Sequence, residues 1–441
     1  MGKKKNIVFY FSDQQRWDTV NEDVTPNLMK LASEGVSFDE NFTCQPVCGP
    51  ARACLQSGLY ATQVGCYYNG IALPDTVTPL AHYFNEAGYQ TAYVGKLHLA
   101  SDRIPHIGVH CEKTPVPKDR QGEYQYWRSA DILEFTSHGY DGYIFDGDGN
   151  KLDFEGYRAD CINDYATEFI ENRDKDKPFF LFVSQLEPHH QNDHHCYEGY
   201  KPTVDDYKDY PLPDDLTFLK GDYEKMYPDY ISAINRLDYN VGRLVETLKK
   251  EGIYDDTIII YTSDHGSHFK TRNPEYKRSC HDSSTHTPLI IKGGGFEGGR
   301  VEKRLTSLID LPPTLLSLAG IPIPKSYMGV DLTKQIDTDE HRDCVFIQIS
   351  EATNSRAIRT QRYKYSVKDS CPFGYLHHSA KIYFEDYLFD LNEDPIEKNN
   401  LVKDPNYAEV RKELKQKLIE QMINAGEKAP IILPALIVRK K

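Results

Sequence analysis

Short, fully apolar runs alternate with longer amphipathic segments along most of the chain. The runs "NIVFYFS" (6–12), "TIIIY" (257–261) and "TPLII" (287–291) are typical of parallel strands that are covered on both faces of a sheet. Apolar residues three and four positions apart across 231–248 predict one face of a long helix. Thr25 is placed to cap another helix, at "PNLMKLASE". The alternation predicts an α/β fold built from βαβ units.

The pattern changes at about residue 337. The segments "DCVFIQIS", "AIRTQRYKYSV" and "YFEDYLFDLNEDP" alternate in the manner of antiparallel strands. A charged stretch from Tyr407 to Ala425 predicts a helix after them. We therefore expect two units, residues 1–336 and residues 337–441, of which the second is a smaller antiparallel sheet with a helix.

Composition and charge narrow the class of protein. The 441 residues are 39% hydrophobic and 27% charged, as in soluble globular proteins. A formal net charge of −14 argues against a nucleic-acid partner, because nucleic-acid binding normally needs a basic face. The apolar run near the N-terminus is too short for a signal core or a membrane span. We expect a cytoplasmic protein with no membrane partner, whose ten cysteines are free thiols.

Polar residues follow two of the apolar runs directly, and ligands gather at the carboxyl ends of strands in open α/β sheets. Asp13 and Gln14 follow the first run, and Asp264 and His265 follow a later one. Carboxylate, amide and imidazole groups from two strand ends suit one divalent cation. Taken singly, Asp13 and Asp264 are more often loop caps or surface acids, and it is the repeated Ser-Asp-polar pattern at two strand ends that favours a cation site.

Two more strand ends carry basic groups. Lys96 and His98 stand in "GKLHL", and His189 stands in "EPHHQN". A lone histidine is more often a structural group than a catalyst, and a lysine at a strand end is usually solvated. If the three converge beside a cation, they can hold an anion while a histidine donates a proton to a leaving group.

The segment "CQPVCGPARACLQSG" (44–58) contains three cysteines close together. Residues 48–52 match the pattern C-x-P-x-R, and with its flanks the segment resembles the signature of the type I sulfatases. "FSDQQRWD", "GKLHL", "EPHH", "TSDHG" and "TPLII" also occur in the order found in that family, so the resemblance covers nearly the whole chain. It implies an alkaline phosphatase-like fold: a large, mostly parallel mixed sheet flanked by helices, and a smaller C-terminal antiparallel sheet.

The resemblance also implies roles for individual residues. In sulfatases a maturation enzyme oxidises the motif cysteine to formylglycine, which makes Cys48 the precursor of the nucleophile and leaves Cys44 and Cys54 as packing thiols. Lys277 fits the family better than Lys270 because of its spacing from Pro288. The implied set is Asp13, Gln14, Asp264, His265 and the modified Cys48 for the metal; Arg52, Lys96 and His98 for the aldehyde hydrate; and His189 and Lys277 for the sulfate and its leaving oxygen.

Some positions depart from the family pattern. Gln14 stands where many members have Asp, and His265 stands where many have Asn. The resemblance implies calcium as the ion. The site has one negative charge fewer and a softer nitrogen ligand than an all-oxygen calcium site, which makes manganese the alternative. His286 replaces a common arginine. We expect the substrate to face Arg272, His281, His286 and Arg103, with Trp17, Tyr67 and His106 in nearby loops.

Three hypotheses follow for the function. The leading one is a sulfuric ester hydrolase whose substrate is a sulfated small molecule or saccharide, because Tyr, Trp, Arg and His side chains suit a polar sugar. The second is a phosphonate monoester or phosphodiester hydrolase of the same superfamily, which Gln14 and His265 favour. The third is a catalytically silent, sugar-binding relative.

Overall fold

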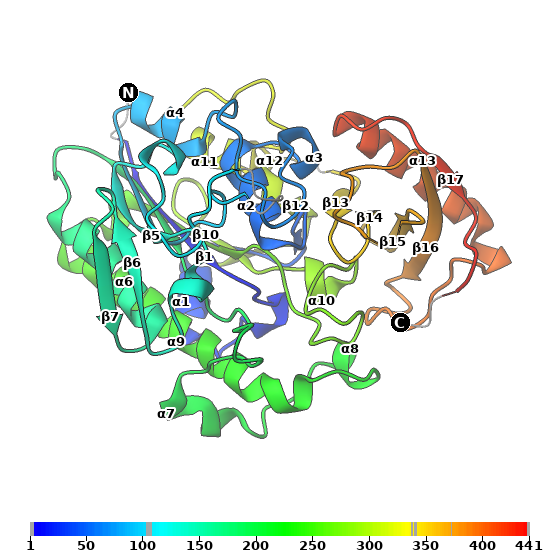
Figure 1. Cartoon of the computed structure of the whole chain (residues 1–441), viewed down its shortest axis with the longest axis horizontal. Coiled ribbons are helices and arrows are strands. Elements are labelled where there is room, and N and C mark those ends of the chain that lie inside the picture. The colour runs from blue at the N-terminus through cyan, green and yellow to red at the C-terminus, as the bar shows by residue number, and fades with distance from the viewer. Residues whose placement is uncertain (1–3, 103–107, 337, 339–341, 372, 439–441) are drawn as a thin grey trace.

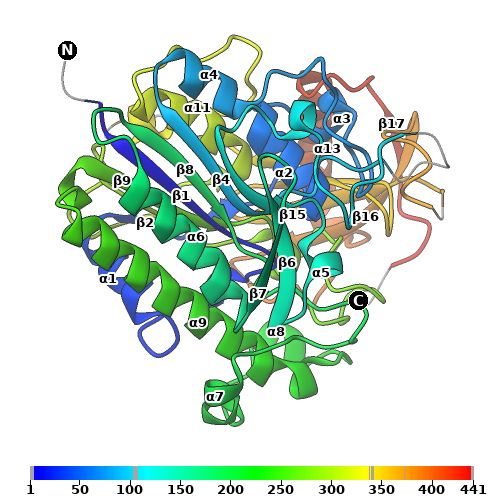
Figure 2. The same cartoon turned by 60° about the vertical axis from the view of Figure 1, so that its left-hand side comes forward.

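The structure is a computed structural model that describes residues 4–102, 108–336, 338, 342–371 and 373–438 (Figure 1). Most of the chain forms one large sheet between helices, and the C-terminal segment forms a smaller sheet beside it (Figures 1 and 2). This arrangement confirms the predicted α/β class with a smaller C-terminal sheet.

The large sheet is mixed, with a parallel centre. In order across the sheet its ten strands are β11 (Arg300–Glu302), β2 (Val36–Phe38), β10 (Leu289–Lys292), β9 (Thr257–Ser263), β1 (Asn6–Ser12), β8 (Phe179–Ser184), β4 (Gln90–Lys96), β5 (Tyr126–Ala130), β6 (Asp141–Asp146) and β7 (Lys151–Glu155). Strands β9, β1, β8, β4 and β5 run parallel to one another. β10, which we expected to be parallel, is antiparallel to β9. The link between them contains only the short helix α10 (Asp282–Thr285), whereas a parallel return needs a longer crossover.

Successive residues of β1 face opposite layers of helices, as the two-residue period of a strand requires. Val8 and Tyr10 pack into one hydrophobic core, and Ile7, Phe9 and Phe11 pack into the other. Figure 2 shows helices lying across the first face; they are α1 (Pro26–Glu34), α6 (Arg158–Asn172) and α9 (Tyr223–Lys250). The second face is covered by α2 (Cys48–Ser57), α4 (Leu80–Glu86) and α11 (Leu311–Leu318). The strand is apolar throughout because both of its faces are buried.

Helix α1 is capped by a residue of α9. The buried carboxylate of Asp238 accepts hydrogen bonds from the backbone N–H groups of Asn27 (3.0 Å) and Leu28 (2.7 Å). Thr25 occupies the N-cap position, but its hydroxyl donates to the carbonyl of Asn21. The predicted N-cap position of Thr25 is therefore confirmed, but its side chain makes no capping hydrogen bond.

Replacing Asp238 with alanine is expected to lower the free energy of unfolding by about 1–3 kcal/mol, because two buried N–H groups lose their acceptor. Asp238→Asn retains one acceptor oxygen and is expected to lose less. Urea denaturation of both variants checks this. An alanine variant as stable as the native protein would show that the cap contributes nothing.

The C-terminal sheet packs against one helix. Its strands are β13 (Val345–Ile349), β14 (Ser355–Arg359), β15 (Tyr363–Lys368), β16 (Ile382–Asp390) and β17 (Ile431–Leu433). The first four are antiparallel, as predicted, and the short β17 pairs parallel with β16. Leu414, Leu418 and Met422 of α13 (Ala408–Asn424) are buried against this sheet, close to the predicted helix at 407–425. The predicted division at residue 337 falls between α12 (Leu332–Gln335) and β13.

The remaining elements are short. They are the strand pair β3 (Asn41–Phe42) and β12 (Thr306–Ser307), the helices α3 (Ala61–Val64), α5 (Leu133–Thr136), α7 (Lys201–Val204) and α8 (Asp214–Thr217), and 3₁₀ turns at Trp17–Thr19, Lys118–Arg120, Asp205–Tyr207, Tyr254–Asp256, Leu308–Asp310 and Pro405–Tyr407. No helix in the described ranges has both the length and the apolar character of a membrane span. No disulfide joins any of the ten cysteines, all of which lie in the described ranges. The cytoplasmic location stays a prediction.

Candidate active site

The candidate residues converge because their strands end at one edge of the sheet. β1 and β9 are parallel neighbours that pair Ser12 with Ser263, so Asp13 and Asp264 leave the sheet side by side. β8 and β4 lie on the other side of β1, and Lys96 is the last residue of β4. The sheet topology thus assembles residues that are far apart in the sequence.

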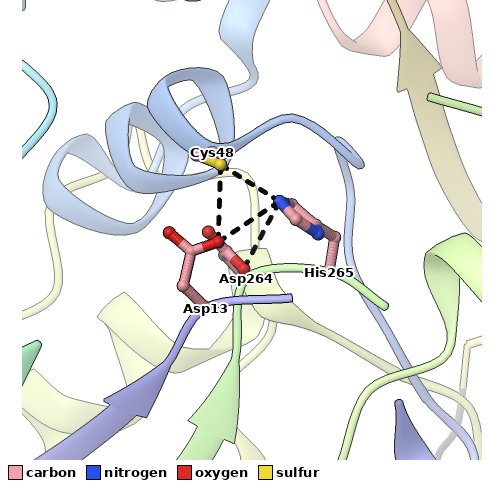
Figure 3. A group of neighbouring side chains, drawn as sticks. All are labelled: Asp13, Cys48, Asp264 and His265. Carbon is pink, nitrogen blue, oxygen red and sulfur yellow. Dashed lines mark hydrogen bonds and ion pairs between the residues drawn. The ribbon is translucent and has the colours of Figure 1, made fainter. Parts of the chain in front are cut away.

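Four side chains form a compact buried cluster at this edge: Asp13, Cys48, Asp264 and His265 (Figure 3). Their ligand atoms all lie within 4.8 Å of one another. The thiol Sγ of Cys48, the first residue of α2, is 3.2 Å from His265 Nε2 and 3.5 Å from Asp13 Oδ1. His265 Nδ1 donates to the carbonyl of Gly266 at 3.0 Å, which leaves Nε2 facing the cluster.

The donor atoms of this cluster suit a cation. Burial and the neighbouring Asp13 carboxylate raise the pKa of Asp264 to about 7, and Asp264 Oδ2 accepts no hydrogen bond from any described residue. Burial lowers the pKa of His265 to about 4, so its imidazole is neutral at pH 7. Two buried carboxylates and a neutral imidazole nitrogen directed at one point are what a divalent ion requires.

Gln14 is the fifth predicted metal ligand, and its left-handed backbone (φ 71°) brings it to the wall of the same cavity. Its amide nitrogen donates to the hydroxyl of Tyr197 at 2.7 Å and to Ser267 Oγ at 3.2 Å. These two bonds fix the orientation of the amide. The oxygen of Gln14 therefore remains as the atom that can bind a cation.

Two buried, positively charged side chains hold Asp13 in place. Lys96 Nζ donates to Asp13 Oδ2 at 2.9 Å and to Glu134 Oε1 at 3.0 Å, and Arg52 donates to Asp13 Oδ2 at 3.0 Å. Burial alone would raise the pKa of Asp13, but positive groups led by Lys96 outweigh it and hold that pKa well below its usual value. Asp13 is therefore ionised, and the positive charge that an anion needs is concentrated locally.

Lys277 and His189 face Cys48 from the open side of the cluster. Lys277 Nζ donates to Cys48 Sγ at 2.8 Å and lies 3.3 Å from His189 Nε2. Burial and the charge of Lys277 keep the pKa of His189 well below its usual value, so His189 is neutral. His98 also lines the cavity, with a left-handed backbone (φ 59°). Each of these residues can contact a group bound at Cys48.

The cluster opens into a cavity of about 370 Å³, large enough for a small polar ligand. Several of its lining residues were not predicted from the sequence: Asn69, Ile132, Glu134, Phe135, Asn192, Glu275, Tyr276, Arg278 and Glu351. Arg278 was within reach of prediction because it follows Lys277. Glu351 was not, because it comes from the C-terminal unit and only the fold brings it here.

Three residues that we expected to face the substrate lie elsewhere. Arg272 donates to the carbonyls of Ile396 and Glu397, and His281 is buried against Tyr387. The cavity around Cys48 is not lined by Arg272, His281 or His286. The structure therefore does not support substrate contacts by Arg272, His281 or His286.

Two of the expected loop residues, Trp17 and Tyr67, also lie apart from the cavity around Cys48. Trp17 stacks on His286 with ring centroids 4.5 Å apart, and the Tyr67 hydroxyl donates to the carbonyl of Tyr375. Neither Trp17 nor Tyr67 lines that cavity. Arg103 and His106 fall outside the described residues.

Comparison with known proteins identifies the family. Residues 5–321 match the family model described as "Sulfatase". The chain belongs to the sulfatase family. Residues 275–424 of this sulfatase also match the model "N-sulphoglucosamine sulphohydrolase, C-terminal". Its enzyme class is therefore that of the sulfuric ester hydrolases.

Similar proteins span nearly the whole sulfatase chain. An ulvan-active sulfatase of Formosa agariphila is 28% identical, covering 96% of this chain and 82% of its own. An N-acetylglucosamine-6-O-sulfatase of Bacteroides thetaiotaomicron is 25% identical, and the match covers 95% of this chain and 86% of that protein.

Solved structures share the fold. A protein in complex with its substrate D-glucosamine-2-N,6-O-disulfate superposes with a TM-score of 0.81 at 23% identity, covering 97% of this chain and 99% of its own. A phosphonate monoester hydrolase from Silicibacter pomeroyi superposes with a TM-score of 0.69 at 22% identity, covering 96% of each chain. At these identities both comparisons concern the fold alone.

Proposed function

We propose that this sulfatase hydrolyses a sulfate ester of a carbohydrate, using residue 48 as the nucleophile. The observation that carries the proposal is the position of Cys48 Sγ, which contacts Asp13, His265 and Lys277 at the start of α2. The two similar sulfatases named for ulvan and for N-acetylglucosamine support a saccharide substrate.

Cys48 is proposed to be the precursor of formylglycine, which a separate maturation enzyme would produce. As formylglycine, residue 48 would supply a hydrated aldehyde, of which one hydroxyl attacks sulfur and the other loses a proton to expel sulfate. The cavity position of Sγ, at the first turn of α2, fits such a nucleophile, because a helix N-terminus favours the sulfate charge. The segment's packing thiols, Cys44 and Cys54, do not line the cavity.

A divalent cation is proposed at the buried cluster. Asp13, Asp264, His265, the oxygen of Gln14 and modified residue 48 would hold it, with calcium as the expected ion and manganese as the alternative. Bound there, the ion would act as a Lewis acid toward the nucleophile and the sulfate oxygens.

The protein's own side chains position the charges and the proton. Arg52 and Lys96 hold Asp13 ionised and direct it toward residue 48. Lys277, whose Nζ donates a hydrogen bond to Cys48 Sγ, would contact a sulfate oxygen and pass a proton to the leaving oxygen, and the neutral His189 beside it would hydrogen-bond the sulfate. His98, which lines the same cavity, would accept the proton that the nucleophile gives up.

The net reaction converts a sulfate ester and water into an alcohol, inorganic sulfate and a proton. A panel of sulfated monosaccharides tests it, with sulfate release measured by ion chromatography. Release of sulfate and the matching free sugar is expected from protein made together with the maturation enzyme. Absence of sulfate release from every member, and from an aryl sulfate, would contradict the proposal.

Lys277→Ala is expected to lower kcat by roughly 10²–10³-fold with a smaller change in KM, because leaving-group protonation and charge neutralisation are lost together. The loss is expected to grow as the pKa of the leaving phenol rises along a series of aryl sulfates. Steady-state kinetics on that series check the slope. Lys270→Ala is the matched control, since Lys270 pairs with Asp222 outside the cavity. A slope unchanged in Lys277→Ala would remove Lys277 from the leaving-group step.

A phosphonate monoester or phosphodiester hydrolase is the second candidate, favoured by Gln14 and His265 at the proposed metal. A direct comparison of kcat/KM on 4-nitrophenyl sulfate and bis-4-nitrophenyl phosphate, with calcium and with manganese, separates the two. The sulfate monoester is expected to be preferred. A strong preference for the diester would favour the second candidate.

A further inference from the structure

Beside Cys48, four residues form a connected polar wall of the cavity: Asn69, Glu275, Arg278 and Glu351. Arg278 donates to Glu275 at 2.5 Å through one guanidinium nitrogen and pairs with Glu351 through another. Arg278 follows Lys277, whereas Glu351 lies between β13 and β14 of the C-terminal sheet. Both parts of the fold therefore contribute to this wall.

The wall is tied directly to the nucleophile position. Asn69 donates its backbone N–H to Glu351 at 2.6 Å and accepts the N–H of Gly49 through Oδ1 at 2.8 Å. A Cβ at Gly49 would lie 3.0 Å from Asn69 Oδ1 and 3.2 Å from the carbonyl of His98. A side chain at Gly49 would crowd both atoms, so glycine favours this close approach of the wall to residue 48.

Backbone strain is concentrated around the same cavity. Arg278 (φ 67°) and Glu351 (φ 66°) both have left-handed backbones, as do Gln14 and His98 nearby. A left-handed backbone is strained for a residue other than glycine, and strain of this kind clusters at functional sites. The left-handed backbones of Arg278 and Glu351 indicate that the direction of each side chain toward the cavity matters more than the stability of its segment.

The chemistry of the wall matches hydroxyl groups. Carboxylates accept hydrogen bonds from hydroxyls, and a guanidinium donates to hydroxyl and ring oxygens. Within the described residues, the buried Nε of Arg278 has no hydrogen-bond partner, and the Glu275 side chain is 52% exposed. The wall also carries two carboxylates against one guanidinium, so a second anionic group on the substrate would be repelled here.

We propose that this wall is the subsite for the sugar ring that carries the scissile sulfate, and that the ring is uncharged. Glu351 accepts a hydrogen bond from a ring hydroxyl, and Arg278 donates to a neighbouring oxygen. This inference rests on the proposed sulfatase function and adds a specificity, against uronate rings. It also gives the C-terminal unit a part in substrate selection.

The test compares native protein and Glu351→Gln on N-acetylglucosamine 6-sulfate, galactose 6-sulfate, glucuronic acid 2-sulfate and 4-nitrophenyl sulfate. The native protein is expected to turn over an uncharged ring at least roughly ten-fold faster than the uronate in kcat/KM. Glu351→Gln is expected to lower kcat/KM for the preferred sugar by roughly 10- to 100-fold, mainly through KM. The accompanying loss on the aryl sulfate, which lacks ring hydroxyls, is expected to be much smaller.

Deoxy analogues of the preferred sugar identify the hydroxyl that is recognised. The analogue that lacks it is expected to react poorly with native protein and to lose nothing more in Glu351→Gln. Arg278→Lys keeps the charge but loses the planar donors, and it provides a second test if the Gln variant is unstable. Glu40→Gln is the matched control, because it breaks an Arg–Glu pair of similar burial outside this cavity.

The test distinguishes failure of the subsite proposal from failure of the proposed sulfatase function. A preference for the uronate, or equal losses on sugar and aryl sulfate in both wall variants, would overturn the subsite. No turnover of any sulfate ester, the aryl sulfate included, would instead overturn the proposed function on which the subsite rests.

Discussion

Cys48→Ala is expected to reduce sulfate ester hydrolysis by roughly 10⁴-fold or more, because the nucleophile is lost and its neighbours act only through it. Cys48 Sγ contacts Asp13, His265 and Lys277, so a carboxylate, a neutral imidazole and an ammonium group meet at this one atom. Cys48→Ser is expected to be nearly as inactive, since a serine hydroxyl lacks the second hydroxyl whose deprotonation releases sulfate. Steady-state kinetics on an aryl sulfate measure both losses.

Cys54→Ala is the matched control for this prediction. Cys54 is a fully buried thiol in the same helix, packed in the hydrophobic core rather than at the cavity. We expect it to lose about 1 kcal/mol of stability and to retain activity within about three-fold. Native-like turnover by Cys48→Ala, or an inactive but folded Cys54→Ala, would contradict the assignment of the nucleophile.

Removal of the proposed cation is the second large effect. Asp264→Asn is expected to lower kcat/KM by roughly 10²–10³-fold, because a buried carboxylate ligand is lost. In the native protein, calcium at 100 times its dissociation constant is expected to stabilise the fold by about 2.7 kcal/mol. Differential scanning calorimetry with and without calcium checks this independently of turnover. In Asp264→Asn the calcium-dependent increase in Tm is expected to disappear.

Asp238→Asn separates metal binding from general stability. Asp238 is also a buried carboxylate, but it caps α1 and does not belong to the cluster. Its asparagine variant is expected to melt at a lower temperature and still gain Tm with calcium. If Asp264→Asn keeps the full calcium-dependent gain, the cation does not bind at this cluster.

The central residues of the site could be predicted from the sequence because they lie at the ends of predicted strands. Asp13, Lys96 and Asp264 directly follow or end apolar runs, and parallel neighbours deliver such residues to one edge of a sheet. The resemblance then placed Cys48 among them. Apart from this resemblance, the only long-range assumption needed was a parallel sheet.

Residues in loops and in the second unit could not be predicted in this way. His286 is near Pro288 in sequence, yet its ring stacks between Trp17 and Phe42 and its Nε2 bonds to the carbonyl of Asp39. Glu351 faces the cavity because of how the C-terminal sheet packs. Nothing in the local pattern around it indicates this contact.

The most direct test of the account is mass spectrometry of the peptide that contains residue 48, taken from protein whose specific activity on a sulfated sugar has been measured. We predict an aldehyde in place of the thiol of Cys48, with activity proportional to the fraction converted. Full activity in protein whose residue 48 is entirely an unmodified thiol would contradict the proposed mechanism.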